Sequence, residues 1–577
     1  MKIVVAKKSG FCMGVRRAVE MALDAPSKYE KPIYTFGPII HNPQVLAMFA
    51  ERGISVLKHI PDQGNGTVLV RAHGVPPETK QQLKDAGFKV IDATCPRVVK
   101  VQSIIKSHTR KGYATIIVGD QDHPEVISLL GFSDNKGFVV GTLDEFRALP
   151  QLEQAIVVAQ TTQNQMFYQE VKAWAAAHAP HYEVFDTICD STEKRQAEVR
   201  CLAQQVDAVV VVGGKNSGNT KRLAEIVIDS GRPAYHIESE SELNISTLST
   251  MQSVGVAAGA STPAWIIKGV VRELEQMPMH RRKGLKSFVM RLQRLMLLTN
   301  IYLAFGAACL CYTATHLQGL PLSIPALSVA MLYVLSMHLL NHLTGRAEDR
   351  YNDPSRERFY NRYKILLTTM ALCSGALGLV AAFQMGALPF WALLIMSLLG
   401  LSYNLRFLPT SFGPGLKFRR IRDLPGSKTL LIALAWGIVT AGLPAMAYGH
   451  WQFYSGSFAV VWATGMAFCR TAFFDILDMH GDRIVGKETI PTLLGPERSL
   501  WLLNVALGAT VFLLLAGGCW GILTPLAFFQ LLGPFFLWIV VTLYQKGHLL
   551  PGMQLAFFVD SLFLFTGAVT LIYSVMT

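Results

Sequence analysis

The pattern of hydrophobic and polar positions changes once along the 577 residues, close to residue 290. Before that point, short apolar runs such as 68–70, 115–118 and 209–212 alternate with amphipathic stretches. Continuous apolar runs of this length are typical of strands buried on both faces of a parallel sheet. After that point, runs of about 20 apolar residues recur with few charges inside them, as helices that cross a bilayer require. The sequence therefore predicts an α/β half followed by an all-α transmembrane half.

The same pattern sets the expected domain boundaries. We predict an α/β domain over 1–280, a basic linker over 281–291 and a transmembrane domain over 292–577. The transmembrane half should contain about nine helices. They are expected near 293–315, 322–343, 365–385, 389–404, 429–449, 457–476, 500–519, 522–543 and 553–574.

Charge refines this picture. The formal net charge is +13, but many basic residues lie beside the apolar runs, and alternate loops of the membrane half are long and basic. This asymmetry follows the positive-inside rule and does not resemble a groove for nucleic acid. It predicts a multi-pass protein of the cytoplasmic membrane, with the α/β domain in the cytoplasm and the C-terminus outside. Thiols stay reduced in the cytoplasm, so the nine cysteines need not form disulfides.

Three of the cysteines, Cys12, Cys95 and Cys189, each stand between a predicted strand and a predicted helix. They divide the α/β half into comparable sub-units, near 1–95, 96–190 and 191–280. We therefore expect three small α/β units in a pseudo-threefold arrangement around one centre. Three converging thiolates would hold an iron–sulfur cluster and leave one iron open to a substrate oxygen.

Three histidines, His41, His73 and His123, also follow strands or turns. Together they predict a site for a phosphate-bearing ligand. Glu125, two residues after His123, is a candidate proton source if burial raises its pKa.

Two loops rich in small residues, 213–220 and 258–263, each lie between a strand and a helix. Backbone N–H groups there would cradle an anion. Ser217, Asn219 and Ser261 would add side-chain donors, and the two loops together predict a diphosphate pocket.

These motifs resemble the IspH family, also called LytB, of 4-hydroxy-3-methylbut-2-enyl diphosphate reductases. The resemblance covers residues 1–277 and is carried by the segments GFCMGVRRAVE, HNPQV, RAHGVPP, DATCPRV, HPEV, QTTQ, GGKNSGNTKRL and GASTP. It implies a [4Fe–4S] cluster on the three cysteines and proton delivery led by Glu125. It also implies that Thr161 hydrogen-bonds the substrate hydroxyl. The residues implied to hold the diphosphate are His41, His73, His123, Ser217, Asn219 and Ser261. Gly218 departs from the pattern, because many relatives have a second serine there.

The membrane half carries Asp475, Asp478 and Asp482 on one predicted helix face at the end of an apolar run. Such carboxylates suit Mg²⁺ bridging a diphosphate. This half, over about 290–577, resembles the UbiA family of membrane prenyltransferases. The resemblance adds Asn341 and Asp349 to the implied Mg²⁺–diphosphate site.

Two positions depart from the UbiA pattern. His342 and Gly345 stand where relatives carry aspartates, which removes expected Mg²⁺ ligands. The resemblance therefore implies the UbiA fold and leaves transferase activity open.

The leading interpretation is a membrane-tethered reductase that converts 4-hydroxy-3-methylbut-2-enyl diphosphate to isopentenyl and dimethylallyl diphosphate. The resemblance implies ferredoxin or flavodoxin as electron donor. We also hypothesise that the fusion couples precursor supply to lipid prenylation. Two alternatives are a membrane prenyltransferase with a non-catalytic redox-sensing module, and a membrane-bound electron-transfer or scaffold protein.

Overall fold

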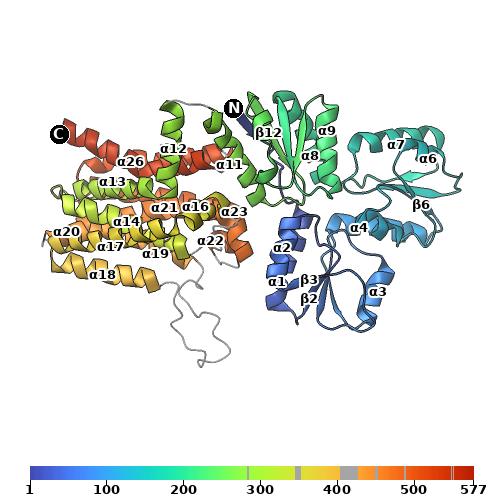
Figure 1. Cartoon of the computed structure of the whole chain (residues 1–577), viewed down its shortest axis with the longest axis horizontal. Helices are drawn as coiled ribbons and strands as arrows, with labels where there is room; N and C mark the ends of the chain where they lie inside the picture. Colours follow the sequence, from blue (N-terminus) through green and yellow to red (C-terminus); the bar gives the residue numbers. More distant parts are fainter. Residues whose placement is uncertain are drawn as a thin grey trace. The chain divides into compact units, whose positions relative to one another are not determined.

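A computed structural model describes residues 1–281, 285–344, 352–402, 426–448, 453–485, 489–546, 549 and 552–577. The chain divides into two compact units, Met1–Pro278 and Met279–Thr577. Figure 1 draws the first unit from blue to green and the second from green to red.

Three four-stranded sheets, with parallel pairing throughout, build the first unit. In spatial order, the first sheet is β3 (Ile54–Leu57), β2 (Ile33–Phe36), β4 (Thr67–Val70) and β5 (Lys89–Asp92). The second is β7 (Gly137–Val140), β6 (Ala114–Val118), β8 (Ala155–Ala159) and β9 (Glu183–Val184). The third is β11 (Ala234–Ile237), β10 (Ala208–Val212), β12 (Ser253–Ala258) and β1 (Lys2–Val5). With β1 counted last, all three sheets share one strand order.

The position of β1 corrects the predicted sub-unit 1–95. Lys2 pairs with Ser253 and Val5 with Val256, so the first strand of the chain completes the third sheet and not the first. Ile3 and Val5 pack against the apolar cluster of that sheet. A short apolar run fits the edge of any sheet, so spacing along the chain did not reveal its partner.

Helices connect these strands, as buried parallel strands require. They are α1 (Met13–Lys28), α2 (Pro43–Glu51), α3 (Pro77–Asp85), α4 (Pro96–Thr109), α5 (Pro124–Leu130), α6 (Leu143–Arg147), α7 (Gln165–His178), α8 (Asp190–Gln205), α9 (Gly218–Asp229), α10 (Ile245–Leu248) and α11 (Ala264–Arg281). Four of them begin at a proline, whose fixed φ suits the first helical position. Every residue of β4, β6, β8 and β10 is buried.

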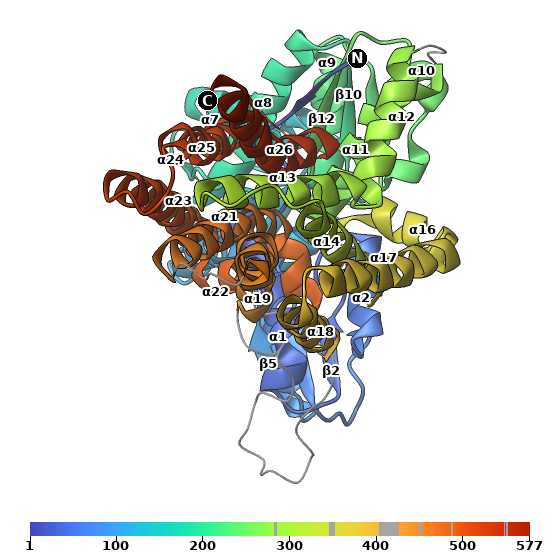
Figure 2. The same ribbon diagram turned by 90° about the vertical axis from the view of Figure 1, so that its left-hand side faces the viewer.

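The second unit is helical. Its elements are α12 (Leu285–Leu298), α13 (Ile301–Leu317), α14 (Ile324–Thr344), α16 (Pro354–Arg362), α17 (Lys364–Gln384), α18 (Ala387–Ser402), α19 (Ser427–Gly437), η3 (Ile438–Gly442), α20 (Leu443–Ala447), α21 (Phe453–Val485), α22 (Ile490–Leu494), α23 (Pro496–Cys519), α24 (Leu526–Phe529), α25 (Leu532–Gln545) and α26 (Met553–Met576). Among the closest packed pairs are α14 with α17, α19 with α21, and α13 with α26 (Figure 2). The predicted linker 281–291 differs from the structure, because α12 already begins at Leu285.

The described residues test the prediction of about nine spans in part. Within the described ranges, seven helices are long and apolar enough to cross a membrane. An eighth would be the pair 288–298 and 301–317, which bends by 73° where Asn300 adopts a left-handed conformation (φ 58). The run expected over 389–404 is the shorter helix α18. Seven of the nine expected runs therefore coincide with such helices, one is divided by the bend, and one is α18, which ends at the last described residue before a gap.

Candidate functional site

Each of the three predicted cluster cysteines directly precedes a helix. Cys12, Cys95 and Cys189 are the N-terminal caps of α1, α4 and α8. The Cys12 sulfur accepts a hydrogen bond from the backbone N–H of Val15 at 3.5 Å. Free N–H groups and the helix dipole favour a thiolate at this position. All three cysteines line one cavity of the first unit.

The sulfurs lie close enough to influence one another. Burial raises the pKa of the Cys95 thiol, and the charges of Cys12 and Cys189 raise it further, while backbone N–H groups of Arg97 and Val98 lower it. A Cβ at Gly14 would lie 2.4 Å from the Cys95 sulfur, so α1 can approach α4 here only without a side chain.

These residues fit a cationic cluster. Three mutually repelling thiolates gain from a shared positive group, and soft sulfur ligands suit iron–sulfur chemistry. Among the described residues, no three His, Cys, Asp or Glu side chains are placed to hold a single metal ion.

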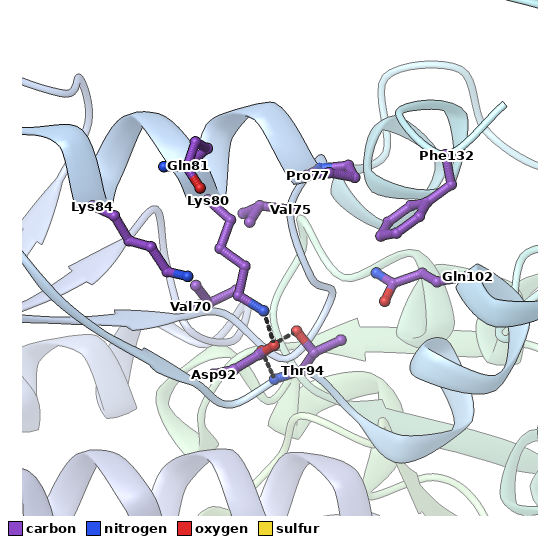
Figure 3. A pocket seen from close by; sticks show the side chains of 10 residues that line it. All are labelled: Val70, Val75, Pro77, Lys80, Gln81, Lys84, Asp92, Thr94, Gln102 and Phe132. Atoms are coloured by element: carbon purple, nitrogen blue, oxygen red, sulfur yellow. Dashed lines mark hydrogen bonds and ion pairs between the residues drawn. The ribbon is translucent and has the colours of Figure 1, made fainter. Parts of the chain in front are cut away.

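A polar network holds the turn that carries Cys95 (Figure 3). One Asp92 oxygen accepts hydrogen bonds from the backbone N–H of Thr94 at 2.9 Å and from its hydroxyl at 2.5 Å, and Lys80 contacts the other oxygen at 2.5 Å. Burial acts to raise the pKa of Asp92, but the hydrogen bonds from Lys80 and Thr94 outweigh it and hold that pKa below its ordinary value. The backbone carbonyl of Thr94 accepts from Arg17 of α1 at 3.0 Å. The turn is thus tied to both α3 and α1.

The three histidines predicted to bind an anion lie together on the wall of the same cavity. Their ring centroids are 5.1 Å apart for His41 and His73, 5.3 Å for His73 and His123, and 6.3 Å for His41 and His123. His41 Nε2 and His73 Nδ1 are buried and have no hydrogen-bond partner in the part of the chain that the structure describes. Buried polar atoms normally have hydrogen-bond partners, so these two nitrogens are available to bind a ligand.

All three imidazoles resist protonation in the ligand-free site. Burial lowers the pKa of each, to about 4 for His123, and the charges of neighbouring histidines and of Arg71 lower those of His73 and His123 further. Asp120 acts in the opposite direction on His123. An incoming anion would offset the mutual repulsion and raise all three pKa values.

Diphosphate affinity should therefore rise as the pH falls. Between the lowered free pKa and the raised bound pKa, binding takes up protons, and the dissociation constant falls by up to about tenfold per pH unit for each proton. The gain ends below the free pKa, which is about 4 for His123. Calorimetry with inorganic diphosphate in buffers of different ionisation enthalpy measures the uptake. The His73→Asn variant should take up fewer protons, and the ligand's own titration cancels in that comparison. Equal uptake by both proteins would contradict the expectation.

The small-residue loops complete this wall. Ser217 directly precedes α9, and its hydroxyl lies 3.3 Å from that of Ser261, across 44 residues of sequence. Among the described residues, the Ser217 side chain makes no capping hydrogen bond. Asn219 Nδ2 is buried without a partner in the same ranges. A helix N-terminus with these side chains suits an anion.

Glu125 is buried at the start of α5, and Thr161 covers its carboxylate. The backbone N–H of Thr161 donates to Glu125 Oε1 at 2.6 Å, and its hydroxyl donates to Oε2 at 2.9 Å. Burial raises the pKa of Glu125, although the Thr161 hydrogen bonds and the Arg222 charge oppose the shift. Both residues line the cavity. A carboxyl with a raised pKa that reaches the cavity through a hydroxyl is suited to deliver a proton.

The second unit holds a separate, mainly apolar cavity of about 470 Å³ between α14, α18 and α19. Its polar residues include Asn341 and Lys428. The predicted carboxylates lie on α21, where Asp475 accepts from the Thr429 hydroxyl and Asp482 accepts from Asn352 Nδ2 at 3.0 Å. Asp478 lies on the same helix.

Asp349 of that predicted site lies outside the described residues, and so does Gly345, one of the two departures from the UbiA pattern. His342, which stands where relatives carry an aspartate, is described. Its Nε2 lies 3.2 Å from Nη1 of Arg356, so a guanidinium occupies its immediate surroundings.

Comparisons with known proteins divide the chain at the same place. Residues 3–275 match the family model described as LytB protein. The chain is 43% identical over 287 residues to the 4-hydroxy-3-methylbut-2-enyl diphosphate reductase of Geobacter sulfurreducens, covering 49% of this chain and 100% of that protein. This chain belongs to the LytB family.

Solved structures and a second family model extend the comparison. A structure of (E)-4-hydroxy-3-methyl-but-2-enyl diphosphate reductase is 41% identical, with a TM-score of 0.38, and covers 48% of this chain and 100% of that one. Residues 301–564 match the UbiA prenyltransferase family model. The apo structure of a UbiA homolog from Aeropyrum pernix K1 is 16% identical, with a TM-score of 0.38, and covers 47% of this chain and 98% of that one. The chain is a LytB domain followed by a UbiA-family domain.

The LytB cavity also depends on contacts of two arginines that the sequence analysis missed. Arg222 of α9 forms an ion pair with Asp120 at 2.8 Å and donates to the Thr162 carbonyl at 3.0 Å, which ties α9 to the loops of His123 and Thr161. Buried Arg195 donates to the carbonyls of Gly10 at 2.9 Å and Ala258 at 2.7 Å. Arg222 lies in the segment GGKNSGNTKRL, but the partners of the two arginines are 60 to 185 residues away, and no local signal connects them.

Proposed function

We propose that the LytB domain reduces 4-hydroxy-3-methylbut-2-enyl diphosphate to isopentenyl and dimethylallyl diphosphate. The observation that carries the proposal is one cavity lined by three cysteines, three histidines and a buried glutamate. Relatives with 43% identity bear the name of this reductase. The substrate's allylic C–O bond breaks, a C–H bond forms, and two electrons and two protons yield one water.

The chain's own residues divide the work. Cys12, Cys95 and Cys189 would hold a [4Fe–4S] cluster, which supplies electrons and a Lewis acid when bound. His41, His73 and His123, with Ser217, Asn219 and Ser261, bind the diphosphate and position the reacting carbon. Thr161 hydrogen-bonds the hydroxyl group of the substrate. Glu125 donates a proton to that hydroxyl group through the side chain of Thr161.

Anaerobic purification of the full chain tests this function. We expect about four irons and four sulfides per chain for a [4Fe–4S] cluster, and reductant-dependent formation of both products by mass spectrometry. A cluster-containing protein that binds the substrate without turning it over would instead support a redox-sensing module. A spectrum unchanged by the substrate would support an electron-transfer protein.

For the UbiA domain we propose that the cavity binds an isoprenoid chain. Its apolar wall suits such a chain, and Lys428 lies where a diphosphate headgroup would need a cation. Mg²⁺ would be held by Asp475, Asp478 and Asp482, with Asn341 and Asp349. Because His342 and Gly345 replace acidic ligands, transferase activity should be weak. The long basic loops orient this domain with the LytB domain in the cytoplasm and the C-terminus outside.

Filling the cavity should abolish isoprenoid binding. Leu431 lines the cavity, and its neighbour Leu430 is exposed and is not among the lining residues. Leu431→Trp should remove the rise in Tm caused by geranyl diphosphate with Mg²⁺, because the indole occupies the ligand's volume. Leu430→Trp should retain it. A Tm rise in both variants would place the ligand elsewhere.

A further inference from the structure

The helical turns that begin at the three cysteines come together at the surface of the LytB domain. Gly14 of α1 contacts Cys95, as its missing Cβ requires. Arg97 of α4 forms an ion pair with Asp190 of α8, with 2.8 Å between Nη2 and Oδ2. The first turns of α1, α4 and α8 are therefore neighbours, although they lie 80 or more residues apart in sequence.

These turns expose both cations and apolar side chains. We call this surface the cysteine face and define it by Met13, Arg16, Arg17, Arg97, Val99 and Lys100. Met13 and Val99 are 66% and 41% exposed, and the four cations are also exposed. The acidic residues of the neighbouring α8 turn are engaged, because Asp190 pairs with Arg97 and Glu193 accepts from Gln165 at 2.7 Å. Counted with Asp190 and Glu193, the four cations still outnumber the carboxylates by two, so the surface carries net positive charge together with exposed apolar side chains.

We propose that the cysteine face docks an acidic electron-carrier protein. The inference rests on the proposed reductase function, which needs two electrons delivered to the shared centre of the three thiolates. Arg16 lies one helical turn from Cys12, and Lys100 lies five residues from Cys95. A carrier seated here would bring its redox group close to the thiolates.

Charge and shape both support a protein partner. Complementary charges steer encounter and speed association at low salt. Exposed apolar side chains next to cations are the kinds of residue that a transient protein interface combines. An anionic lipid surface would also attract the cations, but it gives no reason for their placement around the cysteines.

Two ways of supplying electrons test the docking proposal separately from the proposed reductase function. The full chain in detergent is reduced either by methyl viologen, which needs no docking, or by a reduced bacterial flavodoxin as the acidic carrier. Each one-electron carrier gives one electron, so two are oxidised for each substrate reduced. We expect Arg16→Glu/Lys100→Glu to lower the flavodoxin-driven kcat/KM about tenfold or more at low salt. Viologen-driven turnover should stay within about twofold, because surface substitutions away from the cavity change little.

The matched control reverses the charge of two lysines at the amino ends of strands in the second sheet, away from the carboxyl ends where the candidate residues lie. Lys111 and Lys136 are exposed and precede the amino ends of β6 and β7. Lys111→Glu/Lys136→Glu should leave both rates unchanged. The affinity of immobilised flavodoxin for the protein, measured without substrate, should fall about tenfold in the face variant only.

Distinct outcomes would overturn the proposal. Unchanged flavodoxin affinity in the face variant would place docking elsewhere. Equal loss in both routes would show that the substitutions damage the site itself. In nanodiscs, the face variant could differ from the unaltered protein only in how phosphatidylglycerol changes its turnover. That result would mean that the cysteine face binds lipid. Absence of viologen-driven turnover in the unaltered protein would refute the reductase function, while the affinity measurement would still test the face.

Discussion

Replacing Cys95 with serine should leave the protein with little iron. Cys95 is half-buried between α1 and α4, and a hydroxyl is a much poorer ligand than a thiolate for iron–sulfur chemistry. Gly14 contacts the sulfur and leaves no room for another side chain to take over. We expect iron and acid-labile sulfide to fall severalfold and reductase activity to fall by at least about 100-fold.

The chain offers a close control for this variant. Cys201 lies on α8, the helix that begins after Cys189, but it is exposed and does not line the cavity. Cys201→Ser should keep both iron and activity. Circular dichroism before and after cluster assembly separates loss of the cofactor from loss of the fold. Full iron content in Cys95→Ser would refute the assignment of the three cysteines as cluster ligands.

Glu125→Gln should abolish most turnover while preserving substrate binding. Glutamine keeps the shape of the side chain, and Thr161 can still donate to its amide oxygen. What disappears is the proton, and loss of a positioned general acid typically costs about 10²–10⁴-fold in rate. We expect kcat to fall by that factor, with a much smaller change in the dissociation constant of the substrate.

The pH profile gives this prediction a second readout. Burial raises the pKa of Glu125, and the acid must be protonated to act, so wild-type kcat should fall as the pH rises through that raised pKa. The alkaline fall should be absent from the residual activity of Glu125→Gln. Thr161→Val, which removes the hydroxyl donor to Glu125, should lower kcat and retain the titration. A Glu125→Gln profile with the wild-type fall would mean that another group titrates.

Local chemistry made much of the LytB domain predictable. Runs of β-branched residues such as 209–212 can be buried on both faces of a sheet and become the fully buried strand β10. Prolines at the first helical positions mark where α4 and α5 begin. The candidate residues follow strands, and parallel strands present their carboxyl ends at one edge. The cysteines and histidines could therefore be expected to meet before any coordinate was known.

The membrane half shows where such local signals fail. Hydropathy detects an apolar run but not a bend inside it. The run that the sequence predicts over 293–315 breaks at Asn300, where the chain turns by 73°. A bend of this kind depends on backbone conformation and packing, which hydropathy does not record.

The sequence by itself determined the two-part architecture, the chemistry of the candidate ligands and the family resemblance, because each resides in residue type and short spacing. Tertiary structure decided which distant groups touch. It placed β1 beside β12, Arg222 against Asp120 and Thr161 against Glu125. These contacts span 36 to 251 residues and set burial and electrostatics, hence the pKa values on which proton transfer depends. Long-range contacts of this kind are fixed by the packing of whole elements, to which no local pattern gives access.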